Sequence, residues 1–299
     1  MIRADETFNG SWPFAPHFFA GNDFKMHYVD EGHGTPLICL HGEPTWGYLY
    51  RNFIPPLSRD HRVIVPDHMG FGKSETPQDR KYTLQTHTEN LAALIEDLDL
   101  HDITLVIQDW GGPIGLAYAL RNPERVSRFV LINTVTGYGG ARSPGLSPWF
   151  QFIKDQHEAG TLDEVLGHIG TNLLSIMQRL GLSSKEVLDP NWVEAYSAAF
   201  PDKASSIGAI EFPLDALLRR IVPYVKEGLP LVDRIKGKPA MLVVGMEDKA
   251  IDPYYQIDDF KNLFPGAPIV EIPGAGHFVQ EDAPYILVPL IQQFMQMTR

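Results

Sequence analysis

The sequence predicts an α/β protein built on a mostly parallel β-sheet that is covered by helices. Short apolar segments rich in β-branched residues alternate with longer segments of helical periodicity, and several of the short segments end at polar turns that contain glycine. After residue 136 this alternation stops, and a long stretch has helical patterns only. Because ligands of such sheets bind at the carboxyl ends of the strands, we expect the site among these polar turns.

The first half of the chain contains four of the expected strands, at residues 24–28, 37–40, 62–65 and 103–107. Two helices are expected in the same half. One covers residues 84–98, with Leu91, Leu94, Ile95 and Leu98 on one face, and the other follows residue 112.

The second half continues the pattern around one interruption. A strand at residues 128–133 is followed by helical stretches at 149–157, 162–180 and 191–200, with no convincing buried strand between residues 137 and 224. We interpret residues 137–224 as a helical cap that walls off a pocket and excludes water, inserted into a core domain of residues 1–136 and 225–299. Further strands at 240–244 and 268–272 and a helix at 283–297 complete the core.

Composition limits the classes of partner. The 25 Lys and Arg residues against 37 Asp and Glu residues give a net charge of −12, which disfavours nucleic acid and anionic membranes. The single cysteine, Cys39, cannot form an intramolecular disulfide, which fits a reducing cytosol. The N-terminus lacks the regions of a secretory signal, and no apolar run is long enough to span a bilayer. We therefore expect a monomeric, cytoplasmic protein without a nucleic-acid or membrane partner.

Residues 106–112, VIQDWGG, have the layout of a nucleophile elbow. An apolar run ends at Gln108 and Asp109, two glycines follow, and a helical pattern begins, which predicts a strand, a sharp turn and a helix. In serine hydrolases with this arrangement, the residue on the turn is the exposed nucleophile. Here that residue is Asp109, and a carboxylate is suited to displacing a leaving group from a saturated carbon.

Three polar residues follow three separate predicted strands, in the order Asp109, Asp248 and His277. A nucleophile, an acid and a histidine in this order are typical of hydrolases with such an elbow. A single aspartate after a strand is more often a helix cap or turn residue, but the three positions together favour catalysis. We predict Asp109 as nucleophile, His277 as base and Asp248 as the acid that orients it, with Glu247 and Asp252 as alternative partners of the histidine.

The chain resembles the haloalkane dehalogenases of the α/β-hydrolase superfamily in three motifs. These are HGEPTW at residues 41–46, QDWGG at residues 108–112 and GAGHFVQE at residues 274–281. The similarity extends over nearly the whole length and is weakest in the cap. It implies the α/β-hydrolase fold, with a mostly parallel eight-stranded sheet, flanking helices and a helical cap inserted after the sixth strand.

The resemblance also implies a halide site. In this family the tryptophan beside the nucleophile donates its indole N–H to the leaving halide, which gives that role to Trp110. Glu43 and Asn133 stand where one branch of the family has an Asn halide donor and a Glu acid. These departures indicate the other branch, in which Asp248 is the acid and a second tryptophan comes from the cap.

Two tryptophans of the cap are candidates for the second donor. Trp149, in SPWFQF at residues 147–152, resembles the cap tryptophan of the family in its local context, and we prefer it to Trp192. By analogy with the superfamily, the backbone N–H groups of Glu43 and Trp110 form the oxyanion hole.

The implied reaction is the hydrolysis of a haloalkane to a primary alcohol and halide. Asp109 displaces the halide and becomes an alkyl ester, and a water molecule activated by His277 then hydrolyses this covalent intermediate. The partners are a small halogenated alkane and water, with halide as product. We expect no metal and no organic cofactor, since the sequence has neither metal-ligand spacing nor a dinucleotide-binding glycine motif.

Two alternative functions stay open. An epoxide hydrolase would use the same Asp-His-Asp triad with cap tyrosines as donors, and Tyr138, Tyr196 and Tyr224 are available. Trp110 favours halide over epoxide, because an epoxide oxygen calls for an acidic phenol. The other alternative is a catalytically silent binding protein of the same fold, although such relatives usually lose a triad residue and this chain keeps all three.

Overall fold

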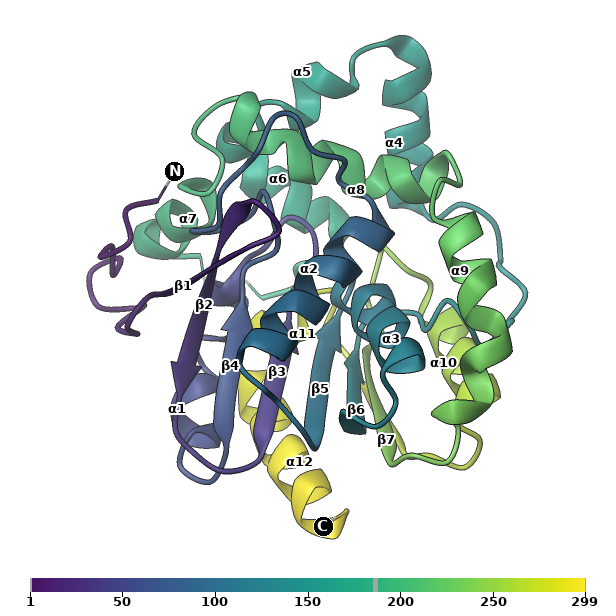
Figure 1. Ribbon diagram of the computed structural model, residues 1–299. Coiled ribbons are helices and arrows are strands. Elements are labelled where there is room, and N and C mark those ends of the chain that lie inside the picture. The colour runs from purple at the N-terminus through teal and green to yellow at the C-terminus, as the bar shows by residue number, and fades with distance from the viewer. Residues whose placement is uncertain (1, 185–187, 299) are drawn as a thin grey trace.

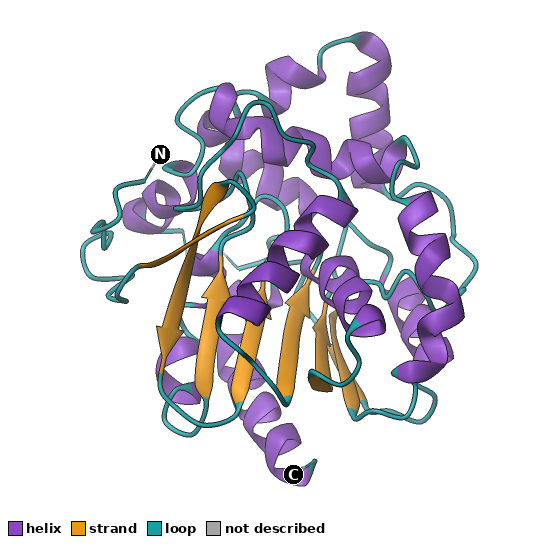
Figure 2. Ribbon diagram, in the orientation of Figure 1, coloured by secondary structure: helices purple, strands orange, loops and turns teal. Residues whose placement is uncertain are grey.

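Within residues 2–184 and 188–298, which the structure describes, eight β-strands form one sheet in the order β1-β2-β4-β3-β5-β6-β7-β8 (Figures 1 and 2). The structure is a computed structural model. The strands β1 and β2 are antiparallel to their neighbours, and β4, β3, β5, β6, β7 and β8 run parallel. The strands are β1 His17–Gly21, β2 Phe24–Glu31, β3 Pro36–Leu40, β4 Arg62–Pro66, β5 Ile103–Gln108, β6 Val126–Ile132, β7 Ala240–Gly245 and β8 Ile269–Ile272. The predicted mostly parallel sheet is confirmed.

Seven of these strands were expected from the sequence, and β1 was not. It lies at the edge of the sheet and exposes most of its side chains, so it lacks the apolar alternation that marks the others. The central strands β3 and β5 are buried along their whole length, as expected for parallel strands covered on both faces. Their register pairs Leu40 with Ile107, which brings the loop after β3 beside the elbow after β5.

Helices cover both faces of the sheet. The helices α2 Leu84–Asp97, α3 Gly111–Arg121 and α9 Val222–Gly228 pack in a row on one face, while α1 Ile54–Leu57 and α12 Pro284–Met297 pack together on the other (Figure 1). The helix α10 Pro253–Leu263 packs on β7, and the short α11 Val279–Asp282 precedes α12. No helix among the described residues is long and apolar enough to cross a membrane.

Five further helices lie between β6 and β7 and sit above the carboxyl ends of the strands (Figure 1). We call them the cap helices: α4 Pro148–Ala159, α5 Leu162–Leu166, α6 Ile169–Leu180, α7 Pro190–Ser197 and α8 Ile207–Leu217. The single helix expected at residues 162–180 is two helices, since the chain breaks at Gly167, a poor helix former. The predicted boundary between residues 224 and 225 falls inside α9, and the division into core and cap stays a prediction.

Candidate active site

Asp109 stands on a strained turn between β5 and α3. Its φ of +47° is left-handed, a conformation that L-residues other than Asn, Asp and His seldom adopt. The turn is fixed on both sides of the residue: its N–H donates to the carbonyl of Asn133 at 3.2 Å, and the Thr134 hydroxyl donates to its carbonyl at 2.6 Å. Such strain concentrates at functional sites, where the surrounding structure maintains it.

Two glycines make room for this turn. A Cβ atom at Gly42 would lie 2.1 Å from Oδ1 of Asp109, and one at Gly112 would lie 2.0 Å from the hydroxyl oxygen of Thr134. Both distances are far inside van der Waals contact. The glycines in HGEPTW and QDWGG therefore let the loop after β3 approach the elbow closely.

The two carboxylate oxygens of Asp109 have different neighbours. The backbone N–H of Glu43 donates to Oδ1 at 2.8 Å. The other oxygen, Oδ2, lies 3.5 Å from Nε2 of His277. One oxygen is thus held by a backbone donor, while the other faces the imidazole.

His277 is paired with Asp248, as the order of residues along the chain predicts. Its Nδ1 lies 3.0 Å and 3.1 Å from the two carboxylate oxygens of Asp248. The same carboxylate accepts hydrogen bonds from the side-chain amides of Asn133 at 2.8 Å and Gln256 at 2.9 Å. The alternative partner Asp252 instead accepts a hydrogen bond from the N–H of Tyr255 at the start of α10.

Electrostatics in this cluster depend on Asp109. Burial would lower the pKa of His277, but the carboxylates of Asp248 and Asp109 outweigh burial and raise its pKa to about 10. Burial, followed by the charge of Asp109, raises the pKa of Glu43 well above its usual range. With Asp109 ionised, the imidazole is therefore protonated at pH 7, and the shift in the pKa of Glu43 favours its neutral form.

Trp110 lies under the cap. Its ring stacks on Phe212 of α8, with centroids 4.7 Å apart and an interplanar angle of 15°. The side chain is almost wholly buried. An indole N–H is a donor without an acceptor lone pair, and next to a carboxylate on a strained turn it can serve a bound anion.

The two candidate cap tryptophans have different surroundings. Trp149 is buried on α4, which packs on α8, the helix that carries Phe212. Trp192 on α7 packs edge-on against Tyr196, whose ring in turn contacts Tyr48 near the N-terminal segment. The helix of Trp149 thus packs on the helix whose Phe212 contacts Trp110. Trp192, whose buried indole N–H has no hydrogen-bond partner among the described residues, belongs to a separate aromatic cluster.

Three residues at the site were not predicted to contribute to it. The side-chain amide nitrogen of Gln108 lies 3.2 Å from Nε2 of His277, Asn133 supports Asp248, and Phe212 backs Trp110. Gln108 ends β5 and Asn133 directly follows β6. A polar residue at the carboxyl end of a strand is a signal that could have identified both as site residues. Phe212 lies in a mostly apolar helix with few polar residues, so its orientation could not be predicted.

The three candidate tyrosines make other contacts, and the buried hydroxyl of Tyr138 has no hydrogen-bond partner among the described residues. The hydroxyl of Tyr196 donates to Glu281, which also binds the guanidinium of Arg51. The ring of Tyr224 lies under the guanidinium of Arg121, and Tyr138 packs against Gly228. These contacts do not direct a pair of phenols toward Asp109.

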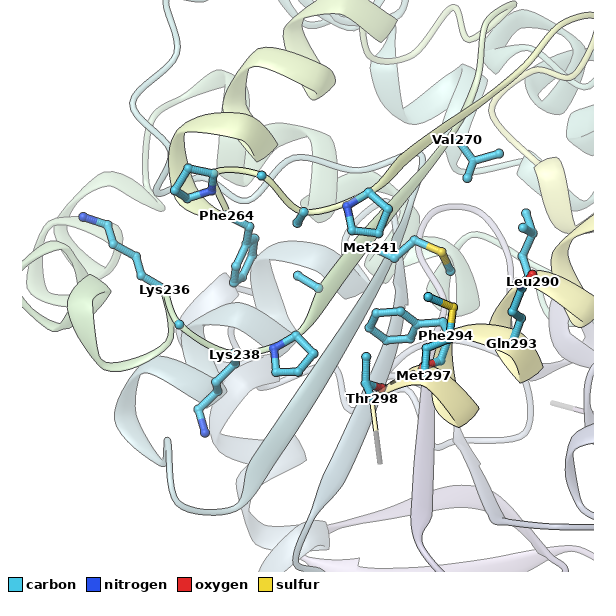
Figure 3. Close-up of a pocket in the computed structure, with 17 residues that line it drawn as sticks. Lys236, Lys238, Met241, Phe264, Val270, Leu290, Gln293, Phe294, Met297 and Thr298 are labelled. Carbon is cyan, nitrogen blue, oxygen red and sulfur yellow. Dashed lines mark hydrogen bonds between the residues drawn. The ribbon is translucent and has the colours of Figure 1, made fainter.

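An open apolar groove of about 630 Å³ lies at the opposite end of the sheet (Figure 3). It is formed by the starts of β7 and β8 and the end of α12, and Met241, Phe264, Phe294 and Met297 line it. Asp109 follows the carboxyl end of β5, so this groove is not part of the site. Among the described residues, no group of three or more His, Cys, Asp or Glu side chains is placed to hold a metal ion.

Comparison with known proteins gives the same fold and names related enzymes. Residues 35–284 match the family described as alpha/beta hydrolase fold. A cis-3-alkyl-4-alkyloxetan-2-one decarboxylase from Shewanella oneidensis is 32% identical over 96% of this chain and 90% of its own length. Haloalkane dehalogenase 1 of Mycobacterium bovis is 36% identical, over 96% of this chain and 95% of its own length.

The structure is also similar to the solved structure of a haloalkane dehalogenase. The tetrameric haloalkane dehalogenase from Paraglaciecola agarilytica superposes with a TM-score of 0.78 at 28% identity, covering 98% of this chain and 96% of that one. Over most of its length, the chain therefore belongs to the α/β hydrolase fold family, in the branch that contains the haloalkane dehalogenases.

Proposed function

We propose that this protein hydrolyses haloalkanes to a primary alcohol and halide through a covalent alkyl ester on Asp109. One observation supports this most directly: Oδ1 of Asp109 is held by the Glu43 N–H, while Oδ2 faces His277, and Trp110, whose indole N–H is a donor, follows Asp109 in sequence. The similarity to haloalkane dehalogenases over nearly the whole chain supports the same reaction.

The first step is an in-line displacement. An oxygen of Asp109 bonds to the carbon that bears the halogen, the carbon–halogen bond breaks, and the halide leaves with the bonding electron pair. In this proposal the indole N–H groups of Trp110 and Trp149 stabilise the developing anion. The stacking of Trp110 on Phe212, and the packing of α4 on α8, support Trp149 over Trp192 as the second donor.

The second step uses a change in the charge of Asp109. In the ester, the carboxylate charge that helps to raise the pKa of His277 is gone, so this pKa falls and the imidazole can accept a proton from water. The water oxygen bonds to the ester carbonyl carbon. The resulting tetrahedral oxyanion accepts hydrogen bonds from the backbone N–H groups of Glu43 and Trp110. On collapse the bond from the carbonyl carbon to the alkyl oxygen breaks, and the proton of the added hydroxyl passes to the leaving alkoxide. This releases the alcohol and restores the carboxylate of Asp109, while Asp248 stabilises the imidazolium.

Parallel assays with a haloalkane and an epoxide test the substrate class. We expect bromide release and butanol from 1-bromobutane, and no diol from styrene oxide. Diol formation without bromide release would replace the dehalogenase proposal with the epoxide hydrolase alternative. In either case, loss of turnover in Asp109→Ala would exclude the silent binding protein.

A second candidate activity is decarboxylation of a β-lactone, because a relative at 32% identity over 96% of the chain is named for that reaction. The same assay tests it with a cis-3,4-dialkyloxetan-2-one, from which the products would be an alkene and carbon dioxide. Alkene formation without bromide release from 1-bromobutane would favour this activity over dehalogenation.

The remaining expectations about assembly and location stay predictions. The protein is proposed to act as a cytoplasmic monomer, and one related structure is tetrameric. Light scattering after gel filtration measures the oligomeric state, and a mass of about four chains would contradict the monomer proposal.

A further inference from the structure

Gln108 is a buried glutamine whose side-chain amide contacts His277 twice. Its Nε2 atom lies 3.2 Å from Nε2 of His277 and 3.3 Å from the main-chain carbonyl oxygen of the same residue. Both residues are fully buried, and Oε1 of Gln108 has no hydrogen-bond partner among the described residues. A buried oxygen without a partner costs free energy, so the contacts of the nitrogen with His277 determine how the amide is oriented.

The main-chain carbonyl of His277 fixes which end of this amide faces the ring. A carbonyl oxygen is only an acceptor, so the group 3.3 Å from it is the NH2 group of Gln108. The amide oxygen in that place would face a second acceptor with no hydrogen between them. The other N–H of the NH2 group is directed to Nε2 of the imidazole, and Gln108 is therefore a hydrogen-bond donor to the ring.

A donor at Nε2 favours the neutral imidazole. Nδ1 lies 3.0 Å and 3.1 Å from the carboxylate oxygens of Asp248, so the hydrogen of a neutral ring is on Nδ1. Nε2 then has a lone pair that can accept the N–H of Gln108. Asp109 has the opposite effect, because its Oδ2, 3.5 Å from Nε2, favours a second proton there. Gln108 and Asp109 thus compete over the protonation of one nitrogen atom.

The charge of Asp109 decides this competition in the free enzyme. Asp248 and Asp109 together raise the pKa of His277 to about 10, and Glu43, in the loop after β3, is a further titratable group that interacts with the ring electrostatically. In the alkyl ester the charge of Asp109 is gone, while the donor of Gln108 remains. The imidazolium then releases its Nε2 proton to solvent, and this is the one proton that hydrolysis of a haloalkane produces.

We propose that Gln108 is a positioning residue that holds His277 as a neutral base after Asp109 has been alkylated, by donating an amide N–H to Nε2. This rests on the proposed dehalogenase function and deepens it. The contact of 3.2 Å is at the long end of the hydrogen-bond range, so the incoming water can replace Gln108 at Nε2. The second N–H keeps its bond to the carbonyl of His277 and so keeps the ring in place.

NMR titration of His277 tests this role without turnover. Asp109→Ala removes the carboxylate charge, as the ester does, and the resonance of His277 in histidine-labelled protein is the one missing after His277→Phe. In the Asp109→Ala background, Gln108→Met replaces the amide by an apolar chain of similar shape. It should raise the pKa of His277 by about one pH unit, because one hydrogen bond to the neutral ring is lost. Gln108→Glu should raise it further, since a carboxylate stabilises the imidazolium.

Hydrolysis of the alkyl-enzyme gives the kinetic counterpart. After a single turnover with 1-bromobutane, the pH profile of ester hydrolysis in Gln108→Met should be displaced to higher pH, with a rate about 10-fold lower than the parent on its acid side. Gln280→Met removes another fully buried amide, from α11, and should keep the profile of the parent. A purely structural role of Gln108 would lower the rate at every pH without displacing the profile.

The two proposals fail in different ways. If Gln108→Met leaves the pKa of His277 in Asp109→Ala unchanged or lowers it, the role of Gln108 is wrong, whatever the activity of the enzyme. If that pKa rises as expected but the parent forms no alkyl-enzyme and releases no bromide, Gln108 still favours the neutral histidine, and dehalogenation is the proposal that is overturned.

Discussion

His277 has a pKa that depends on the chemical state of its neighbour. The carboxylates of Asp248 and Asp109 raise it to about 10 in the free enzyme, and esterification of Asp109 removes one of these two charges. In the proposed mechanism the pKa therefore falls when the ester forms, and the histidine becomes a base when the second step requires one.

This sequence of events predicts a pH dependence of the intermediate. A protonated His277 cannot take a proton from water, so hydrolysis of the alkyl-enzyme should slow as pH falls below the pKa of the histidine in that state. Rapid-quench mass analysis with 1-bromobutane should find more alkyl-enzyme at low pH than at high pH. An amount of intermediate that does not change with pH would exclude His277 as the base.

The second halide donor can be identified by substitution of single tryptophans. Trp149→Phe should weaken the quenching of indole fluorescence by bromide and lower the rate of alkylation by about 10-fold or more, since a donor to the leaving anion is lost. Trp192→Phe is the matched control and should change neither quantity, because its ring packs on Tyr196. The reverse result would transfer the role to Trp192.

The residues that could be predicted from the sequence share one property. Asp109, Asp248 and His277 each follow a strand, and the ends of parallel strands meet at one edge of the sheet, so position along the chain implies proximity in space. Phe212 and the exact environment of Glu43 depend on contacts between distant segments. Periodicity contains no information on such contacts, and the structure was needed to find them.

At the scale of secondary-structure elements, the end of α6 is docked on both catalytic loops. The carbonyl of Gly181 accepts a hydrogen bond from the N–H of His277 at 3.2 Å, and the carbonyl of Leu180 accepts one from the N–H of Lys249 at 3.1 Å. Asp282 adds a further link, since it binds the N–H groups of Ser183 and Gly276. The cap and the loop of the histidine are thus one hydrogen-bonded unit.

A glycine at this junction tests the docking. A Cβ atom at Gly276 would lie 1.6 Å from the carbonyl oxygen of Gly181, so Gly276→Ala must separate α6 from the loop of His277. We expect a loss of about 1–3 kcal/mol in the free energy of unfolding and a decrease in kcat. Gly237→Ala, where a Cβ would meet nothing within 4 Å, is the control and should leave thermal stability and kcat as they are. Equal behaviour of the two variants would contradict the role of this junction.

The cap was predicted as a helical insertion, but the sequence predicted its helices less completely than it predicted the strands of the sheet. The strands of the sheet have apolar runs bounded by polar turns, whereas α8 is apolar apart from Glu211 and Asp215, and α5 is too short to show a period. Periodicity identifies a helix most readily when a broad polar face lies opposite an apolar one, as in α4, which was predicted, whereas α8 was not.

At the scale of the whole molecule, buried histidines couple stability to pH. His41, His68 and His87 are buried together, and burial lowers the pKa of each, to about 3 for His87. Neither ring nitrogen of His87 has a hydrogen-bond partner among the described residues. The unfolded chain, in which histidine has its ordinary pKa of about 6.5, therefore binds more protons than the folded protein as pH falls below that value.

These buried histidines should make the folded protein less stable in acid. Stability should decrease as pH is lowered from 6.5 toward 3, by up to about 1.4 kcal/mol per pH unit for each such histidine. His87→Leu removes one of these groups and should make thermal stability less sensitive to pH between about 6.5 and about 5. Thermal unfolding of the two proteins across this range is the measurement, and parallel curves would show that His87 does not titrate on unfolding.

The proposed covalent bond to Asp109 can be detected directly when the second step is blocked. His277→Phe should allow the first step and block the second, so incubation with 1-bromobutane should raise the protein mass by one butyl group, with the adduct on the peptide that contains Asp109. The double variant with Asp109→Asn should stay unmodified. A His277→Phe protein that releases bromide without an adduct, or one with the butyl group on another residue, would contradict the account.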